Sequence, residues 1–195
     1  MSYWSPEYLM GRWQPTIGDP TFMGWFTVFS YFACAVVAFI AVFVNQMGGR
    51  RSVLFWAMIA FLMILLGINK QLDVQSLLTE IGRQVAKAQG WIDNRRPVQF
   101  WGIVIFGITA LAAFSVFVLM FRRVFRRFML AFVGLFVLVS FIIIRAASFH
   151  HFDQILGFTF LGARVNWILE LTGIYLILCG GVKEILYLRR LNTRW

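Results

Sequence analysis

Residues 22–44 read FMGWFTVFSYFACAVVAFIAVFV, an uninterrupted apolar run without a charged side chain. A helix needs roughly 17 to 25 apolar residues to cross a hydrocarbon core of about 30 Å. This run therefore predicts a transmembrane helix. It is longer than the apolar region of a secretory signal peptide, and no basic cluster precedes it, so we expect it to stay in the protein as a span.

Four further apolar runs follow, at residues 52–68, 100–121, 128–144 and 165–182. Of the 195 residues, 61% are hydrophobic and only 13% are charged, against about 25% charged in an ordinary soluble domain. A soluble fold of this length cannot bury that much apolar surface, which excludes a water-soluble enzyme. The same composition excludes a disordered chain. We predict an all-α polytopic membrane protein with five spans in one domain.

The basic residues are concentrated in alternate connections. The segments after the first, third and fifth spans contain one acid, Glu184, and the basic residues Arg50, Arg51, Arg122, Arg123, Arg126, Arg127, Lys183, Arg189, Arg190 and Arg194. Cytoplasmic loops of membrane proteins are enriched in Lys and Arg. The net charge of +10 therefore indicates topology rather than nucleic-acid binding. We expect the N-terminus outside, the C-terminus in the cytoplasm, and a location in the bacterial inner membrane.

The connection between the second and third spans has a helical pattern. One apolar stripe recurs at intervals of three and four residues, formed by Val74, Leu77, Leu78, Ile81, Val85 and Ala88. Polar residues lie on the opposite face, where Glu80 and Arg83 are close enough to pair. We predict an amphipathic helix over about 72–91 that lies in the membrane interface, capped by Asp73 and ended by Gly90. It either covers the outer ends of the spans or forms a lid over an outer cavity.

The outer connections also contain polar residues close to the membrane boundary. Ionisable groups near hydrocarbon are energetically costly, so they tend to pair or to line a wet cavity. We expect Arg145 to pair with Asp153 or Glu170, and Lys70 to pair with Asp73. Such pairs are either structural or part of a binding site with the candidate residues Asn69, Lys70, Asp73, Glu80, Arg145 and Glu170.

Both histidines of the chain lie in one short motif, His150-His151-x-Asp153. His150 and Asp153 are three residues apart and can face together on a helix. Imidazole and carboxylate are zinc ligands, so these two residues are the candidate metal ligands or acid–base groups. Two histidines at a membrane boundary are also ordinary hydrogen-bonding residues. A single axial histidine to haem or another pigment, or a quinone among the phenylalanines, is a further cofactor hypothesis.

Glycines occur in the fifth span at Gly173, Gly180 and Gly181. Small residues let the backbones of transmembrane helices approach closely. We therefore expect a neighbouring helix to pack tightly against the fifth span at these positions.

Three functions are compatible with these patterns. The first is a non-catalytic subunit or scaffold of a larger membrane complex or homo-oligomer, which binds partner helices, lipids or an apolar cofactor. The second is a metal-dependent hydrolase that acts on lipid at the outer face. Its ligands would be His150 and Asp153, with the Arg145–Glu170 pair in support and Asp73 and Glu80 on the facing wall. The third is a small transporter or channel. The apolar, charge-poor composition favours the first.

Overall fold

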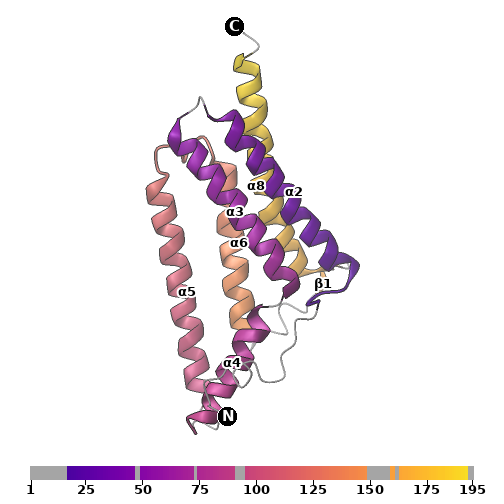
Figure 1. Ribbon diagram of the computed structural model, residues 1–195, viewed down its shortest axis with the longest axis vertical. Coiled ribbons are helices and arrows are strands. Elements are labelled where there is room, and N and C mark those ends of the chain that lie inside the picture. Colours follow the sequence, from indigo (N-terminus) through magenta and orange to yellow (C-terminus); the bar gives the residue numbers. More distant parts are fainter. Residues whose placement is uncertain are drawn as a thin grey trace.

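The structure is a computed structural model that describes residues 17–46, 49–72, 74–90, 95–148, 159–160 and 163–192. Its elements in chain order are α2 (Phe22–Val44), α3 (Arg50–Leu72), α4 (Val74–Ala88), α5 (Arg95–Met120), α6 (Met129–Ser148), β1 (Thr159–Phe160), β2 (Ala163–Arg164) and α8 (Val165–Asn192). The two short strands form an antiparallel pair directly before α8, a feature that the sequence did not predict. Figure 1 shows the long helices running roughly along the longest axis of the molecule.

The prediction of five membrane spans is confirmed. Five helices in the described part of the chain are long and apolar enough to cross a bilayer: α2, α3, α5, α6 and α8. The first coincides with the predicted run at 22–44. The protein is thus an all-α polytopic membrane protein, with the β1–β2 pair as its small addition.

Several helices extend beyond the predicted spans. α3 continues from residue 68 to Leu72, because Lys70 finds a partner within the bundle and does not end the helix. α6 continues past Arg145 to Ser148. α8 continues from residue 182 to Asn192 through a basic segment with exposed side chains. Hydropathy marks the part of a helix that lies in hydrocarbon, whereas the backbone hydrogen bonds continue into the polar region.

The amphipathic helix is confirmed as α4. Gly90 follows it with φ +74°, a left-handed conformation that ends helices and favours glycine. The Glu80–Arg83 ion pair is present, with 3.2 Å between Arg83 Nη1 and Glu80 Oε2. Asp73, the predicted cap, lies outside the described residues. The location of α4 in the membrane interface stays a prediction.

The helices pack in an order that differs from their order in the sequence. α2 packs against α3, α5 packs against α6, and α8 packs against both α2 and α6. The predicted close contacts of α8 are confirmed. A Cβ atom built on Gly134 of α6 would lie 2.7 Å from the carbonyl oxygen of Gly173, and one on Gly181 would lie 2.8 Å from Val37 of α2. Glycines thus bring α8 to within backbone distance of its neighbours.

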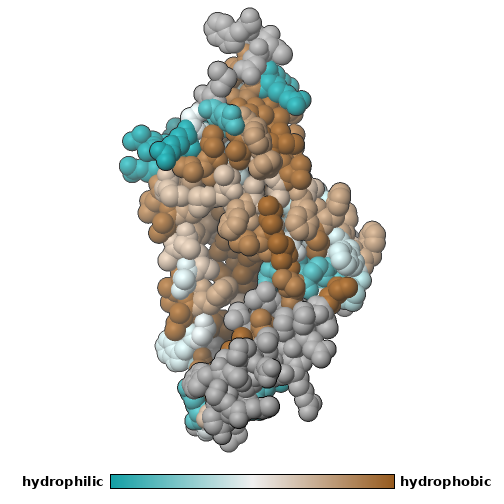
Figure 2. All heavy atoms as spheres, viewed as in Figure 1, coloured by the Kyte–Doolittle hydropathy of each residue, from teal (hydrophilic) through white to brown (hydrophobic). Residues whose placement is uncertain are grey.

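A cluster of buried aromatic rings joins α3 to the α5–α6 hairpin. The centroid of the fully buried Phe55 ring lies 4.8 Å from that of Phe128, 5.0 Å from Phe132 and 5.4 Å from Phe121. This cluster lies toward the end of the bundle that holds the α2–α3 connection, the α5–α6 turn and the last turns of α8. We call this end of the bundle the basic end, because its connections carry the arginines of residues 50–51 and 122–127. Figure 2 shows hydrophilic side chains there, next to a largely hydrophobic middle.

Candidate functional site

A buried cluster of polar side chains joins α2, α3 and α8 toward the end of the bundle opposite the basic end. Lys70 Nζ donates a hydrogen bond of 2.9 Å to Glu170 Oε2. The Tyr31 hydroxyl donates a hydrogen bond of 3.1 Å to the other carboxylate oxygen of Glu170. The three residues are only 2 to 7% exposed. Both oxygens of the Glu170 carboxylate therefore have a partner inside the protein.

Three helices position this cluster. Lys70 lies in the last turn of α3, and Glu170 lies in the second turn of α8. Gly67, one turn before Lys70, faces α2, because a Cβ atom there would lie 3.2 Å from the Cβ of Tyr31. A larger residue at this position would push α2 away from α3, so glycine helps to bring the Tyr31 hydroxyl to Glu170.

The short segment before α2 also contacts this cluster. Asp19 Oδ2 lies 3.9 Å from Lys70 Nζ, and the Asp19 side chain is 26% exposed. Its Oδ1 atom accepts a hydrogen bond of 2.6 Å from the Thr21 hydroxyl, and Thr21 caps α2 by accepting one of 3.1 Å from the Gly24 amide. The Gly18 amide donates to the carbonyl of Gln71 at 2.8 Å. These bonds attach the start of α2 to the end of α3.

The chemistry of this cluster is that of a buried ion pair. The Lys70 and Glu170 side chains are only 5% and 3% exposed, so in this conformation they are out of reach of a substrate in water. A buried charge that has lost its partner costs about 3–5 kcal/mol. The pair can therefore fix which helices are neighbours and in what register they pack.

The predicted Arg145–Glu170 pair is not formed. Glu170 faces Tyr31 of α2 and Lys70 of α3, whereas Arg145 is half-buried near the end of α6 and makes no ion pair with a carboxylate of the described residues. Lys70 pairs with Glu170 across 100 residues of sequence, and its predicted partner Asp73 lies outside the described residues. The chain therefore pairs Lys70 with a distant acid that the local sequence did not indicate.

The other predicted site residues are separate from this cluster. Asn69 is exposed. Glu80 accepts a hydrogen bond of 2.6 Å from Gln84, one turn along α4, in addition to its ion pair with Arg83. The carboxylate of Glu80 is therefore bonded to residues of its own helix.

The predicted metal motif falls on residues that the structure does not describe: His150, His151 and Asp153. Among the described residues, no three His, Cys, Asp or Glu side chains come together in a way that could hold a metal ion. The zinc hypothesis thus depends on residues outside the described ranges and stays a prediction.

Tyr31 and Asp19 were missed by the sequence analysis. Tyr31 carries a hydroxyl group inside an otherwise apolar span, and such a group needs a hydrogen-bond partner when it is buried. That signal could have pointed to Tyr31, but it does not identify the partner. Asp19 precedes the first span, and its proximity to Lys70 results from the tertiary fold, which the local sequence does not indicate.

A second ion pair, also missed, connects the α5–α6 turn to α8 at the basic end. Arg127 Nε donates a hydrogen bond of 3.0 Å to Glu184 Oε2, and Arg127 Nη2 contacts the other carboxylate oxygen. Glu184 is 4% exposed. The Arg127 guanidinium lies 5.5 Å from the ring centroid of Phe128 and 5.4 Å from that of Tyr187. Two-point hydrogen bonding and ring contact hold this turn in place.

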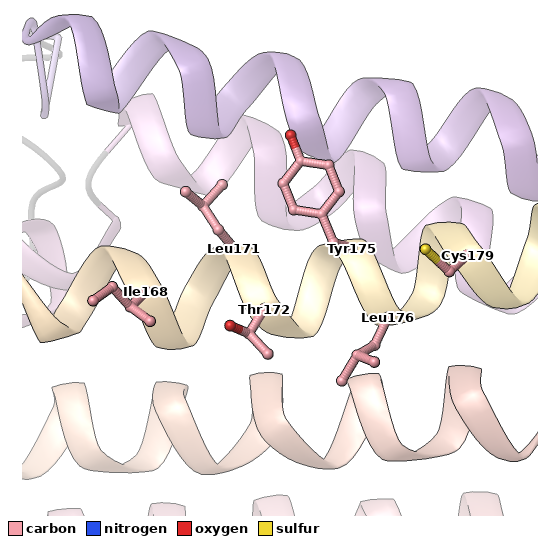
Figure 3. A pocket seen from close by; sticks show the side chains of 6 residues that line it. All are labelled: Ile168, Leu171, Thr172, Tyr175, Leu176 and Cys179. Atoms are coloured by element: carbon pink, nitrogen blue, oxygen red, sulfur yellow. The ribbon is translucent and has the colours of Figure 1, made fainter. Parts of the chain in front are cut away.

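α8 also carries an open, largely apolar groove of about 400 Å³. Figure 3 shows Leu171 and Tyr175 pointing toward α2, and Thr172 and Leu176 pointing toward α6. Ile168 and Cys179 complete the lining. All of its lining residues belong to α8, so it is a shallow hollow along one face of that helix.

Three comparisons with known proteins bear on the function of this chain. No family model, curated protein or solved structure matches it. We therefore take the function from the geometry of the described residues.

Proposed function

We propose that this protein is a non-catalytic subunit of a larger membrane assembly, and that α5 is the helix that contacts the partner. The observation that carries this proposal is the exposure of α5. In the most apolar stretch of α5, between Phe100 and Met120, no residue is fully buried within the chain, whereas 33 to 44% of the residues in the corresponding stretch of each other span are buried. α5 packs mainly against α6, which leaves most of its circumference free for another molecule.

The residues on the free side of α5 support a partner helix. Gly102, Thr109 and Ala113 are exposed, and their spacing of seven and four residues places them on one face. A Cβ atom built on Gly102 would meet no atom within 4 Å. Small residues are enriched where transmembrane helices meet, because they let two backbones approach. This stripe is therefore suited to a helix of another subunit or of a second copy.

The use of the buried charges supports a non-catalytic role. Lys70 is engaged with Glu170, and Arg127 is engaged with Glu184. Each pair joins two segments that are distant in sequence, so these charges stabilise the bundle. A group committed to such a pair is poorly placed to exchange protons with a substrate.

We further propose that the basic end faces the cytoplasm, that the N-terminus lies outside, and that the membrane is the bacterial inner membrane. The distribution of Lys and Arg supports this orientation, because the connections at the basic end and the segment after the fifth span hold ten of the 18 basic residues with one acid, whereas the N-terminal segment and the other two connections hold eight with six acids. Membrane lipids would then be partners in addition to other subunits.

The test is the mass of the particle extracted from its native membrane in a mild detergent. We expect wild-type protein in a particle clearly larger than the 22.6 kDa chain plus its detergent. The triple variant Gly102→Leu, Thr109→Leu, Ala113→Leu should fall to the mass of one chain. Ser115→Leu is the matched control, because Ser115 is an exposed small residue on a different face of α5 and should leave the particle intact.

Other results would favour other functions. A wild-type particle of one chain would contradict the proposal. A mass that is a multiple of the chain mass, without another protein, would identify the partner as a second copy. Stoichiometric zinc that is lost with His150→Ala would favour the lipid hydrolase. Ion or solute flux in proteoliposomes would favour the transporter.

A further inference from the structure

We propose that the α5–α6 turn binds the phosphate group of an anionic membrane phospholipid through Arg122, Arg123 and Arg126. The turn covers residues 121–128 and reads FRRVFRRF. It places three exposed guanidinium groups within five residues of one another, directly between two transmembrane helices. This inference is independent of the proposed role of α5 in binding a partner helix.

The turn is held rigidly by its two terminal phenylalanines. Phe121 and Phe128 are 1% and 2% exposed and pack in the aromatic cluster around Phe55. Inside the turn, the Val124 amide donates to the carbonyl of Phe121 at 2.9 Å, and the Phe128 amide donates to that of Val124 at 3.0 Å. A turn fixed at both ends loses little conformational entropy when it binds a ligand.

One arginine of the turn differs from the other three. Arg127 is engaged with Glu184 and lies over two aromatic rings. Arg122, Arg123 and Arg126 are exposed and make no ion pair with a carboxylate of the described residues. The turn therefore separates one structural arginine from three that are available to a ligand.

Among the described residues, no second acid neutralises these three charges. Glu184 is the acid of the connections at the basic end, and it is already paired with Arg127. The other three acids that the structure describes have partners elsewhere in the molecule: Asp19 lies near Lys70, Glu80 pairs with Arg83, and Glu170 pairs with Lys70. Within the described part of the chain, the three guanidinium groups are thus left for a counter-ion from solvent or from the membrane.

The position of the turn selects a lipid among anionic ligands. α5 ends at Met120 and α6 begins at Met129, so the three arginines lie within a few residues of both spans, at the depth of the headgroups. Exposed apolar side chains stand beside them, with Phe125 at 36%, Met129 at 54% and Leu130 at 36% exposure. A phospholipid can meet both surfaces at once, with its phosphate on the arginines and its acyl chains on the apolar residues.

The experiment is native mass spectrometry of the detergent-solubilised protein during titration with phosphatidylglycerol, cardiolipin or zwitterionic phosphatidylcholine. We expect the wild type to bind the two anionic lipids at least about tenfold more tightly than phosphatidylcholine. The variant Arg122→Gln, Arg123→Gln, Arg126→Gln should lose about tenfold or more of that affinity, because each basic residue near the surface contributes several-fold.

A matched control removes three positive charges from the same end of the bundle. Arg50→Gln, Arg51→Gln, Lys183→Gln changes three exposed residues outside the turn and should keep the preference for anionic lipid. A third variant, Arg122→Lys, Arg123→Lys, Arg126→Lys, keeps the charge and should keep most of the binding, which separates loss of charge from loss of folding.

Four results would overturn the proposal. The first is unchanged binding of anionic lipid by the triple glutamine variant. The second is an equal loss of binding in the control, which would indicate attraction by the total positive charge of this end and not a site in the turn. The third is equal affinity of the wild type for phosphatidylcholine. The fourth is displacement of the lipid by millimolar inorganic phosphate, which would identify a site for free anions.

Discussion

The buried Lys70–Glu170 pair predicts an unusual pattern in a double-mutant cycle. We consider Lys70→Met, Glu170→Gln and the combination of the two. Gln keeps an acceptor for the Tyr31 hydroxyl, which donates to this side chain in the wild type. Met has about the length of Lys without its charge. Each single substitution thus leaves one buried charge without its main partner, whereas the double substitution leaves none.

The magnitudes follow from the burial of the two side chains, 5% and 3% exposed. Removal of one partner of a buried pair costs about 3–5 kcal/mol. Glu170→Gln should fall near the lower end, because Lys70 can turn toward Asp19, 3.9 Å away. Lys70→Met should fall nearer the upper end, because Glu170 then keeps only the hydrogen bond from Tyr31. The double variant should lose only about 1 kcal/mol, since uncharged replacements of buried pairs are often nearly neutral.

The assay is thermal unfolding in detergent, followed by tryptophan fluorescence. About 2–4 °C of Tm per kcal/mol applies to chains of this length, so each single variant should lose about 10 °C and the double variant only a few degrees. Arg83→Met is the control, because Arg83 is 52% exposed in its pair with Glu80, and its Tm should change by no more than about 2 °C. A double variant as unstable as the sum of the singles would refute the reasoning.

Four other substitutions test the helix packing and the second ion pair. Gly134→Ala places a Cβ atom 2.7 Å from the backbone of α8, so it should lower the free energy of unfolding by about 1–3 kcal/mol. Gly82→Ala in α4 is the control, because no atom lies within 4 Å of its Cβ position; it should leave the free energy of unfolding unchanged or raise it by up to about 1 kcal/mol. Chemical unfolding in detergent measures both values. Gly24→Ala places a Cβ atom 2.3 Å from the Asp19 carbonyl oxygen, so it should detach the segment before α2, and faster protease cleavage there would show this. Arg127→Gln removes the ion pair with α8 and should cost about 2–4 kcal/mol, measured as a lower Tm; an unchanged Tm would contradict the role of this pair.

The sequence predicted the spans well because hydropathy directly reports which segments prefer hydrocarbon. It also located Gly90 and the amphipathic helix, because periodicity and a helix-ending glycine are local signals. The helix ends were less well predicted. α3 and α8 continue beyond their apolar windows, and Lys70 lies in the extension of α3.

The polar cluster was predicted only in part. Lys70 and Glu170 were both recognised as residues that need partners, but each was assigned to a different one. Hydropathy does not tell which helices are neighbours, so it cannot choose between acids that are 3 and 100 residues away. In the structure the choice depends on α8 lying next to α2 and on Gly67 bringing α3 close, which are facts of tertiary packing.

The packing order of the helices has a consequence for how the protein is made. α2 and α3 form one hairpin, α5 and α6 form another, and α8, which is synthesised after both, packs against one helix of each. While the ribosome is still translating the region before α8, Glu170 and Glu184 do not yet exist, so Lys70 and Arg127 are made before their counter-ions. Until the last span is made, neither hairpin has the neighbour that covers it in the finished protein, and both ion pairs depend on the same late helix. A stall in translation or a late frameshift would leave that half-built intermediate exposed to membrane quality-control proteases.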